Sequence, residues 1–80
     1  LMDKIPALED AVILKDLGNG KLIIERANGE QWILDAKTSW CSWSWRYEGK
    51  KVSLQFGHWS SRLTSAEGEV CDFWTEEQIL

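Results

Sequence analysis

Residues 21–35 read KLIIERANGEQWILD, and this stretch decides the fold. Two apolar segments, 21–27 and 30–35, lie on either side of Asn28 and Gly29. Asn-Gly is the favoured pair at the tip of a tight β-hairpin, because both central residues of such a turn take a positive φ angle. The stretch therefore predicts two antiparallel strands joined by a tight turn.

Two further segments alternate between apolar and polar residues. Residues 41–47 read CSWSWRY and residues 51–56 read KVSLQF. Alternation with a period of two gives a strand one apolar face and one face toward solvent. The intervening residues 48–50 (EGK) predict a turn, so we expect a second hairpin whose apolar face meets the same core.

The rest of the chain adds shorter elements. Further strands are expected at residues 11–16, 59–64 and 69–74. Pro6, followed by two acidic residues, predicts a short helical turn within residues 1–10. Thr75 can cap a helix and Gln78 can reach back to it, so we expect a helix to start after the last strand.

The chain of 80 residues is long enough for one domain, residues 1–80. Short turns predict that neighbouring strands pair in sequence order. A twisted sheet of this size coils toward a barrel, which removes exposed strand edges. We therefore expect a mostly β fold: a small antiparallel barrel or strongly bent sheet of five to seven strands, with short helical turns near the termini. An SH3-like barrel matches in number and length of strands, and this analogy does not fix a function.

The charge balance narrows the class of partner. The chain has thirteen acidic and nine basic residues, for a formal net charge of −4. A negative field repels phosphate groups, so we expect no nucleic acid and no membrane as partner, and a protein partner instead. No apolar run approaches the roughly 20 residues of a membrane-spanning helix. The chain does not open on a basic segment followed by an apolar one, so we expect a cytoplasmic location.

The two cysteines, Cys41 and Cys71, lack the CxxC spacing of redox and metal motifs. We expect two buried free thiols, as is usual in a reducing cytosol, and a disulfide between them is the alternative. Neither is expected to act as a nucleophile. Cys41 lies on a predicted apolar face, and the acidic neighbour of Cys71 raises the pKa of its thiol.

An enzyme is the least favoured class of function. His58 is the only histidine, with Ser60 and Ser61 nearby and Asp72 further along the chain. A catalytic triad is defined by geometry, and the sequence lacks the Gly-x-Ser-x-Gly turn. Three Cys and His residues in total are too few for a typical zinc site. We expect a non-enzymatic protein without a cofactor.

Calcium binding is the alternative function. Residues 64–80 contain five acidic residues and no Lys or Arg. Hard cations prefer clustered carboxylates, although the spacing of an EF-hand loop is absent. The candidate ligands are Glu67, Glu69, Asp72 and Glu76. The other interpretation of these residues is a solvated acidic face.

The six tryptophans divide into two groups. Those expected in the core are Trp32, Trp43 and Trp45. Phe73 and Trp74 are adjacent in a predicted strand, so they cannot both face inward. Trp40 has the opposite parity to the tryptophans of 41–47, and Trp59 follows a turn. We therefore expect the binding residues to be Trp40, Trp59 and Trp74.

Exposed aromatic side chains are typical anchors of protein interfaces. Together with the acidic composition, they predict a small β module that mediates protein–protein interaction through exposed tryptophans and an acidic surface.

Overall fold

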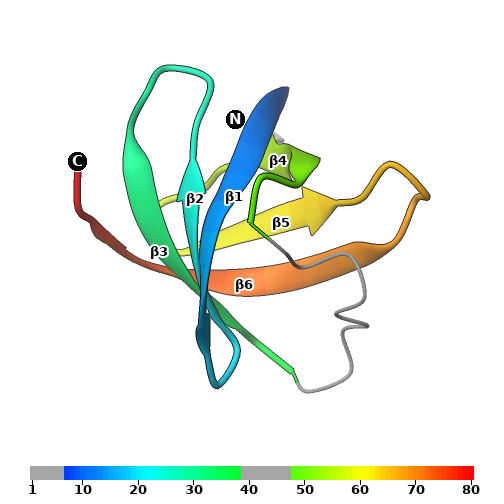
Figure 1. Ribbon diagram of the computed structural model, residues 1–80. Helices are drawn as coiled ribbons and strands as arrows, with labels where there is room; N and C mark the ends of the chain where they lie inside the picture. Colours follow the sequence, from blue (N-terminus) through cyan, green and yellow to red (C-terminus); the bar gives the residue numbers. More distant parts are fainter. Residues whose placement is uncertain (1–6, 39–47) are drawn as a thin grey trace, which may run out of the picture.

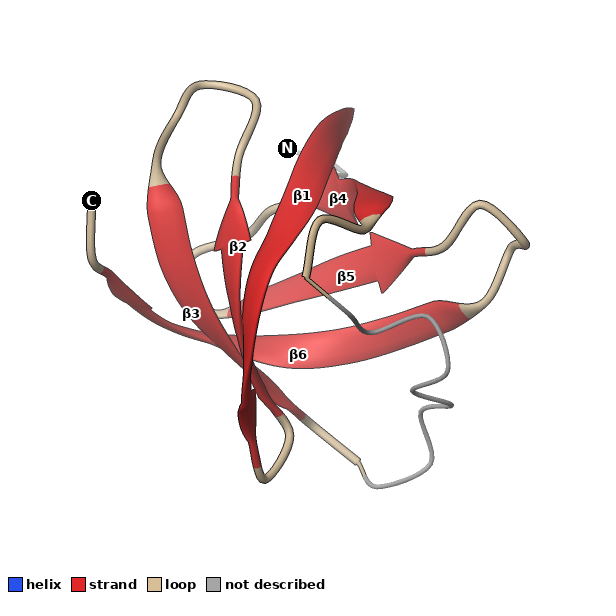
Figure 2. Cartoon of the chain, in the orientation of Figure 1, coloured by secondary structure: helices blue, strands red, loops and turns tan. Residues whose placement is uncertain are grey.

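The structure, a computed structural model, describes residues 7–38 and 48–80. Every regular element in these ranges is a strand, and the strands are joined by turns and loops (Figure 2). In chain order the strands are β1 (Leu8–Gly18), β2 (Lys21–Glu25), β3 (Gln31–Ala36), β4 (Lys51–Gln55), β5 (Ser60–Thr64) and β6 (Val70–Gln78).

The strands form a closed antiparallel barrel in the order β1-β2-β3-β6-β5-β4 (Figure 1). Two three-stranded meanders, β1-β2-β3 and β4-β5-β6, join at both sides through the pairs β3–β6 and β1–β4. The predicted small all-β barrel is thus confirmed. Pairing in sequence order holds within each meander, whereas the pairs β3–β6 and β1–β4 join strands that are distant in sequence and close the barrel.

The helical turns expected near the termini are wrong where the structure describes the chain, because both segments are strands there. Thr75 pairs with Leu34 and Gln78 with Trp32, so the predicted helix start is the end of strand β6. Pairing with β3 supplies the backbone hydrogen bonds that a helix would have supplied. Strand β1 already begins at Leu8, within the segment expected to be helical. The strand predicted at residues 41–47 lies outside the described residues, as do Trp40, Trp43 and Trp45.

The two Asn-Gly pairs form different turns. Asn19 and Gly20 both have positive φ angles, 53° and 84°, and form the tight two-residue turn between β1 and β2. The predicted hairpin of β2 and β3 is confirmed, but its loop is longer: Gly29 N–H donates to Arg26 O at 3.0 Å. Only Gly29 has a positive φ there, because the side chain of Asn28 instead accepts from Glu30 N–H at 2.9 Å. The prediction of a tight turn at Asn28 is therefore wrong.

The barrel is filled by side chains from all six strands. Phe73 is the largest fully buried side chain, and the fully buried aliphatic side chains around it are Ile13, Leu22, Ile24, Leu34, Leu54 and Leu63. Each such burial contributes about 1.5–3 kcal/mol relative to exposure. Trp32 is half-buried at the end of the barrel, where its ring meets Phe56 edge-on at 4.9 Å between centroids.

Cys71 also lies in the core, with 2% of its surface exposed. Its sulfur is disulfide-bonded. The expectation of a free thiol is therefore wrong for Cys71, and Cys41 lies outside the described residues.

Candidate functional site

Strand β6 places two adjacent aromatic side chains on opposite faces of the barrel wall. Phe73 is fully buried, whereas Trp74 is 52% exposed. This alternation follows from the period of two in a strand. As expected from the sequence, only one of the pair faces inward, and Trp74 is the one on the surface.

Trp74 is held in place by its neighbours. It pairs with Asp35 on β3 and with Ser60 on β5, so it sits in the middle of a three-stranded stretch of wall. The ammonium group of Lys37 lies 4.3 Å from the centre of the Trp74 ring. This cation–π contact covers part of the ring and restrains the indole.

Trp59 lies in the turn between β4 and β5 and is 85% exposed. Its carbonyl accepts a hydrogen bond from Thr75 N–H at 3.0 Å, one residue beyond Trp74. The main chains of Trp59 and Trp74 are therefore close, since Ser60, the residue after Trp59, pairs with Trp74. We call Trp59 and Trp74, with Lys37 and Ser60 beside Trp74, the tryptophan surface. Trp40, the third predicted binding residue, lies outside the described residues.

A buried group of hydroxyls fixes the turn that carries Trp59. Thr75 Oγ1 donates to Gly57 O at 2.7 Å and lies 2.7 Å from Ser61 Oγ. Ser61 Oγ in turn accepts from Gly57 N–H at 3.2 Å. Ser61 and Thr75 are buried, so these bonds form away from solvent, where a missing partner is costly.

Ion pairs border the tryptophan surface along β6. Asp72 and Glu76 share the outer face with Trp74, two residues to either side. Asp72 accepts two bonds from Arg62, at 2.7 and 3.2 Å, and these bonds lower the pKa of the Asp72 carboxyl. Glu76 accepts from Lys21 at 3.0 Å, which raises the pKa of the Lys21 ammonium.

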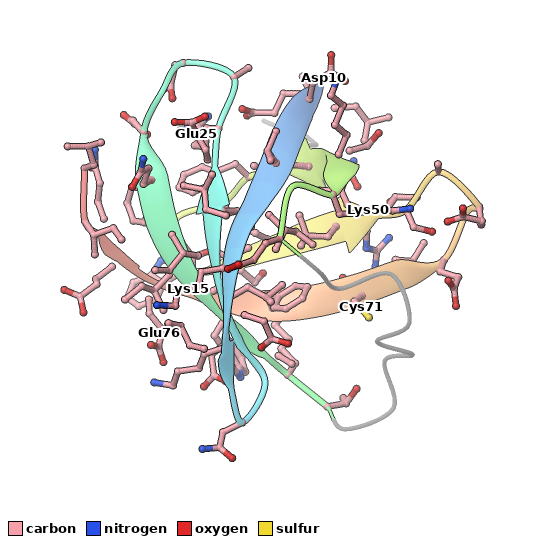
Figure 3. The ribbon with its side chains drawn as sticks, viewed as in Figure 1. Asp10, Lys15, Glu25, Lys50, Cys71 and Glu76 are labelled. Atoms are coloured by element: carbon pink, nitrogen blue, oxygen red, sulfur yellow. The ribbon has the colours of Figure 1, made fainter. Side chains whose placement is uncertain are left out.

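The four candidate calcium ligands are not brought together. Asp72 and Glu76 bond to basic side chains, and Glu67 lies in the turn after β5, 3.9 Å from the ammonium of Lys50. Figure 3 shows Lys50 and Glu76 on opposite sides of the barrel. Glu69 precedes β6. Across residues 7–38 and 48–80 no group of three or more His, Cys, Asp and Glu could hold a metal ion.

Among the described residues, the hydrogen bonds of Ser61 and Asp72 do not involve His58. His58 is exposed, and its ring meets Phe56 edge-on at 5.8 Å between centroids. The hydroxyl of Ser61 is engaged with Gly57 and Thr75, and Asp72 bonds to Arg62. The hydrogen bonds of these groups thus serve the turn and the barrel wall.

The sequence analysis missed a second cluster, at the end of the barrel where β1 begins. The guanidinium of Arg26 lies 3.9 Å from the centre of the Phe56 ring and pairs with Glu9 and Glu30, each at 2.9 Å. Bonds from Trp32 Nε1 and then from Arg26 lower the pKa of Glu30. The bond to Glu9 raises the pKa of Arg26. No single local pattern marks this cluster, because its members come from three separate segments: Glu9, residues 26–32 and Phe56.

No protein-family model, curated protein or solved structure matches this chain. No helix among the described residues is long and apolar enough to cross a membrane.

Proposed function

We propose that this protein is a non-enzymatic module that binds a protein partner through the tryptophan surface. The observation that carries the proposal is the exposure of two tryptophans, Trp59 (85%) in the turn before β5 and Trp74 (52%) on β6. Tryptophan is among the residues most enriched at the energetic centres of protein interfaces. Two such side chains on neighbouring segments of the chain offer a partner apolar anchors.

Contacts within the protein hold the indole of Trp74 and the turn that carries Trp59. Lys37 restrains the indole of Trp74, and the bonds of Thr75 to Gly57 fix the turn that carries Trp59. Binding by ordered side chains loses less conformational entropy than binding by mobile ones. A fully covered aromatic side chain buries about 150–250 Å² of surface. Each Å² of apolar surface removed from water contributes roughly 25 cal/mol of free energy. This order supports the two tryptophans as anchors.

The surrounding charges support a partner with basic groups. The chain has a net charge of −4, and the ion pairs Arg62–Asp72 and Lys21–Glu76 supply the polar rim that interfaces need. A negative field speeds association with a basic partner and slows it with nucleic acid. The calcium alternative has less support, because Asp72 and Glu76 already bond to basic side chains.

A cytoplasmic location stays a prediction. The disulfide at Cys71 weighs against it, because the cytosol keeps most thiols reduced.

The proposal is tested by affinity capture from a lysate of the source cells, run with the parent protein and with Trp59→Ala and Trp74→Ala. The control is Leu17→Ala, because Leu17 is 42% exposed on β1, which is separated from β6 by β2 and β3. We expect one partner with the parent and the control, and its loss with either tryptophan variant. Calorimetry with the purified partner should then show at least a tenfold weaker affinity for Trp74→Ala.

Circular dichroism shows whether each variant is folded. Retention of every captured protein by a folded double variant, Trp59→Ala with Trp74→Ala, contradicts the proposal.

A further inference from the structure

Strand β1 extends beyond the strand next to it. It pairs with β4 over residues 8–12, but its pairing with β2 begins only at Val12, opposite Glu25. Beyond that pair the chain turns away at Arg26 toward β3. Among residues 7–38 and 48–80, no strand therefore lies beside the edge of β1 over residues 8–11 that faces β2.

The main-chain groups on this edge point into the gap. Ile13 N–H donates to Lys50 O at 2.9 Å, and Ile13 O accepts from Gly49 N–H at 2.8 Å, so the main chain of Ile13 faces β4. In an antiparallel strand successive residues face alternate sides, which turns the N–H and C=O of Asp10 and Leu8 toward β2. Within residues 7–38 and 48–80 no partner occupies these groups on that side.

Glu9 closes the inner side of the gap. Its carboxylate accepts from Arg26 Nη2 at 2.9 Å and from Ala27 N–H at 3.2 Å. The Glu9 side chain thus replaces the main-chain pairing that would have joined Ala27 to β1.

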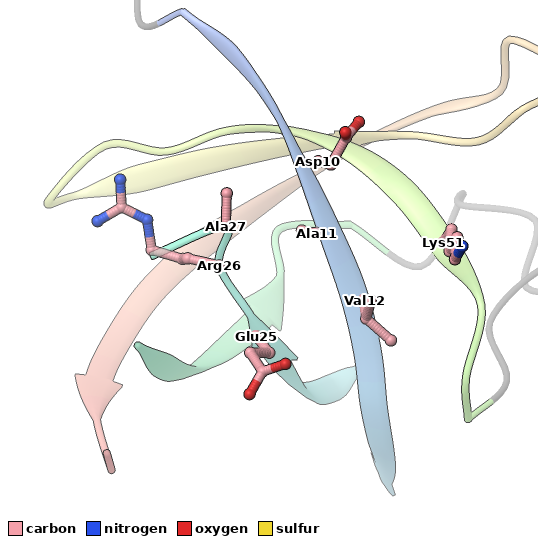
Figure 4. A pocket seen from close by; sticks show the side chains of 7 residues that line it. All are labelled: Asp10, Ala11, Val12, Glu25, Arg26, Ala27 and Lys51. Carbon is pink, nitrogen blue, oxygen red and sulfur yellow. The ribbon is translucent and has the colours of Figure 1, made fainter. Parts of the chain in front are cut away.

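A hollow of about 400 Å³ lies over the gap (Figure 4). Val12 and Ala27 contribute apolar lining, and the side chains of Asp10, Glu25 and Lys51 surround it. Figure 3 shows Asp10 and Glu25 at the same end of the barrel, on neighbouring strands. The hollow thus combines an unoccupied strand edge with room for side chains.

Counted with the two carboxylates that bond to Arg26, four acidic and two basic side chains lie in or next to the lining of the hollow. Asp10 and Glu25 line it with Lys51 and Arg26, and Arg26 is already shared between two further carboxylates, those of Glu9 and Glu30. An excess of carboxylate remains to attract a basic group.

We propose that this edge binds an extended segment of a partner protein by β-strand addition. The segment pairs with the N–H and C=O groups of Asp10 and Leu8, and a Lys or Arg side chain of the segment enters the hollow beside Asp10 and Glu25. Main-chain bonds supply affinity in this mode, and the side-chain pocket supplies specificity.

This site is separate from Trp74. In the order β1-β2-β3-β6-β5-β4, the strand of Trp74, β6, lies three strands from β1 in either direction. The two proposals can therefore fail independently.

The test uses a capped pentapeptide, Thr-Lys-Val-Arg-Thr, with Thr-Glu-Val-Glu-Thr as its acidic counterpart. Two-dimensional ¹H–¹⁵N spectra of the whole chain should show shifts at the amides of residues 8–12 with the basic peptide only. Asp10→Pro removes one edge donor without touching the bonds to β4, and we expect it to abolish these shifts. Asp10→Asn with Glu25→Gln keeps the edge and removes two charges, and we expect about three- to tenfold weaker binding.

Matched controls keep the outcomes distinct. Glu77→Gln removes a charge on β6 and should leave the affinity unchanged, as should Trp74→Ala. Thermal unfolding confirms that each variant is folded.

Three results overturn the proposal: no shift at residues 8–12, equal binding of both peptides, or unchanged binding by a folded Asp10→Pro. A fourth result comes from analytical ultracentrifugation of the protein without peptide. If the protein is a dimer that Asp10→Pro abolishes, the edge binds a second copy of the chain instead of a basic segment, and the proposal is overturned.

Discussion

The hydroxyl of Thr75 donates to the carbonyl of Gly57 at 2.7 Å, which ties strand β6 to the turn between β4 and β5. Thr75 Oγ1 also lies 2.7 Å from Ser61 Oγ, so the bond belongs to a small buried network. The main chain adds a second tie, from Thr75 N–H to Trp59 O. One residue on β6 thus holds the whole turn that carries Trp59.

Thr75→Val should destabilise the protein, because it keeps the shape of the side chain and removes the hydroxyl. Gly57 O then loses a buried donor, which costs about 1–3 kcal/mol of unfolding free energy. For a domain of this size, each kcal/mol lowers the unfolding temperature by about 4–8 °C. Thermal denaturation followed by circular dichroism measures the change. Thr75→Ser keeps the hydroxyl and is the control; equal losses in both variants would show that the hydroxyl is not the cause.

Gly57→Ala should disturb the same turn by a different route. A Cβ atom at Gly57 would lie 2.4 Å from the carbonyl oxygen of Ser60, so the backbone must shift to accept it. We expect a loss of about 1–3 kcal/mol, as for overpacked sites, together with a shift of the Trp59 indole signal in ¹H–¹⁵N spectra. Gly68→Ala is the control, because nothing lies within 4 Å of its Cβ. It strains the turn at positive φ but should leave the Trp59 signal in place, and an unmoved signal in Gly57→Ala would refute the close contact.

The strands were predictable where local alternation specifies them. Residues 51–56 alternate strictly, and β4 has Val52 and Leu54 buried with exposed or half-buried neighbours. The opposite faces of Phe73 and Trp74 follow from the same rule. The barrel itself follows from strand number and length, because closure removes exposed edges.

What the sequence did not predict depends on pairs of residues distant along the chain. The segment after Trp74 has the local pattern of a helix start, yet Thr75 uses its hydroxyl on Gly57 and its backbone in the sheet. The acidic residues of 64–80 looked unopposed in sequence, but the barrel brings Arg62 to Asp72 and Lys21 to Glu76. No local pattern encodes such a register between strands.

Stability should fall in acid because two carboxyl groups have lowered pKa values. Bonds from Arg62 lower the pKa of the Asp72 carboxyl, and bonds from Trp32 and Arg26 lower the pKa of the Glu30 carboxyl. A carboxyl whose pKa is lower in the folded than in the unfolded state stabilises the fold at pH values above its unfolded pKa. This stabilisation is lost as the pH falls through the folded pKa. The unfolding temperature should therefore begin to drop near pH 4 and keep falling below it.

Arg62→Met removes the largest cause of the Asp72 shift and should make the acid decline shallower than in the parent protein. Unfolding temperatures measured from pH 7 to pH 2 make the comparison. Parallel curves for the two proteins would exclude a contribution from this ion pair.

Reduction should destabilise the fold, because Cys71 is both disulfide-bonded and buried in the core. A disulfide typically adds about 2–4 kcal/mol, mainly by restricting the unfolded chain. Thermal unfolding with and without dithiothreitol measures the loss. Alkylation of the denatured, non-reduced protein should leave Cys71 unmodified, and a fully alkylated Cys71 would contradict the disulfide.

Lys37→Met should loosen Trp74 while leaving the barrel intact. Methionine keeps much of the apolar stem of Lys37 but removes the ammonium that lies 4.3 Å from the Trp74 ring. An exposed cation–π contact is worth about 0.5–1 kcal/mol, so the unfolding free energy should change by no more than that. The Trp74 indole signal should shift and broaden in ¹H–¹⁵N spectra, whereas the Trp59 signal should not.

The same variant tests whether order at Trp74 aids binding. If Lys37 restrains the indole for a partner, Lys37→Met should weaken the affinity about two- to fivefold, since the partner must then bear the cost of ordering the ring. Lys15→Met removes an exposed lysine of β1 and is the matched control for the change in net charge. Equal losses of affinity in both variants would assign the effect to charge, and the cation–π contact would then have no part in binding.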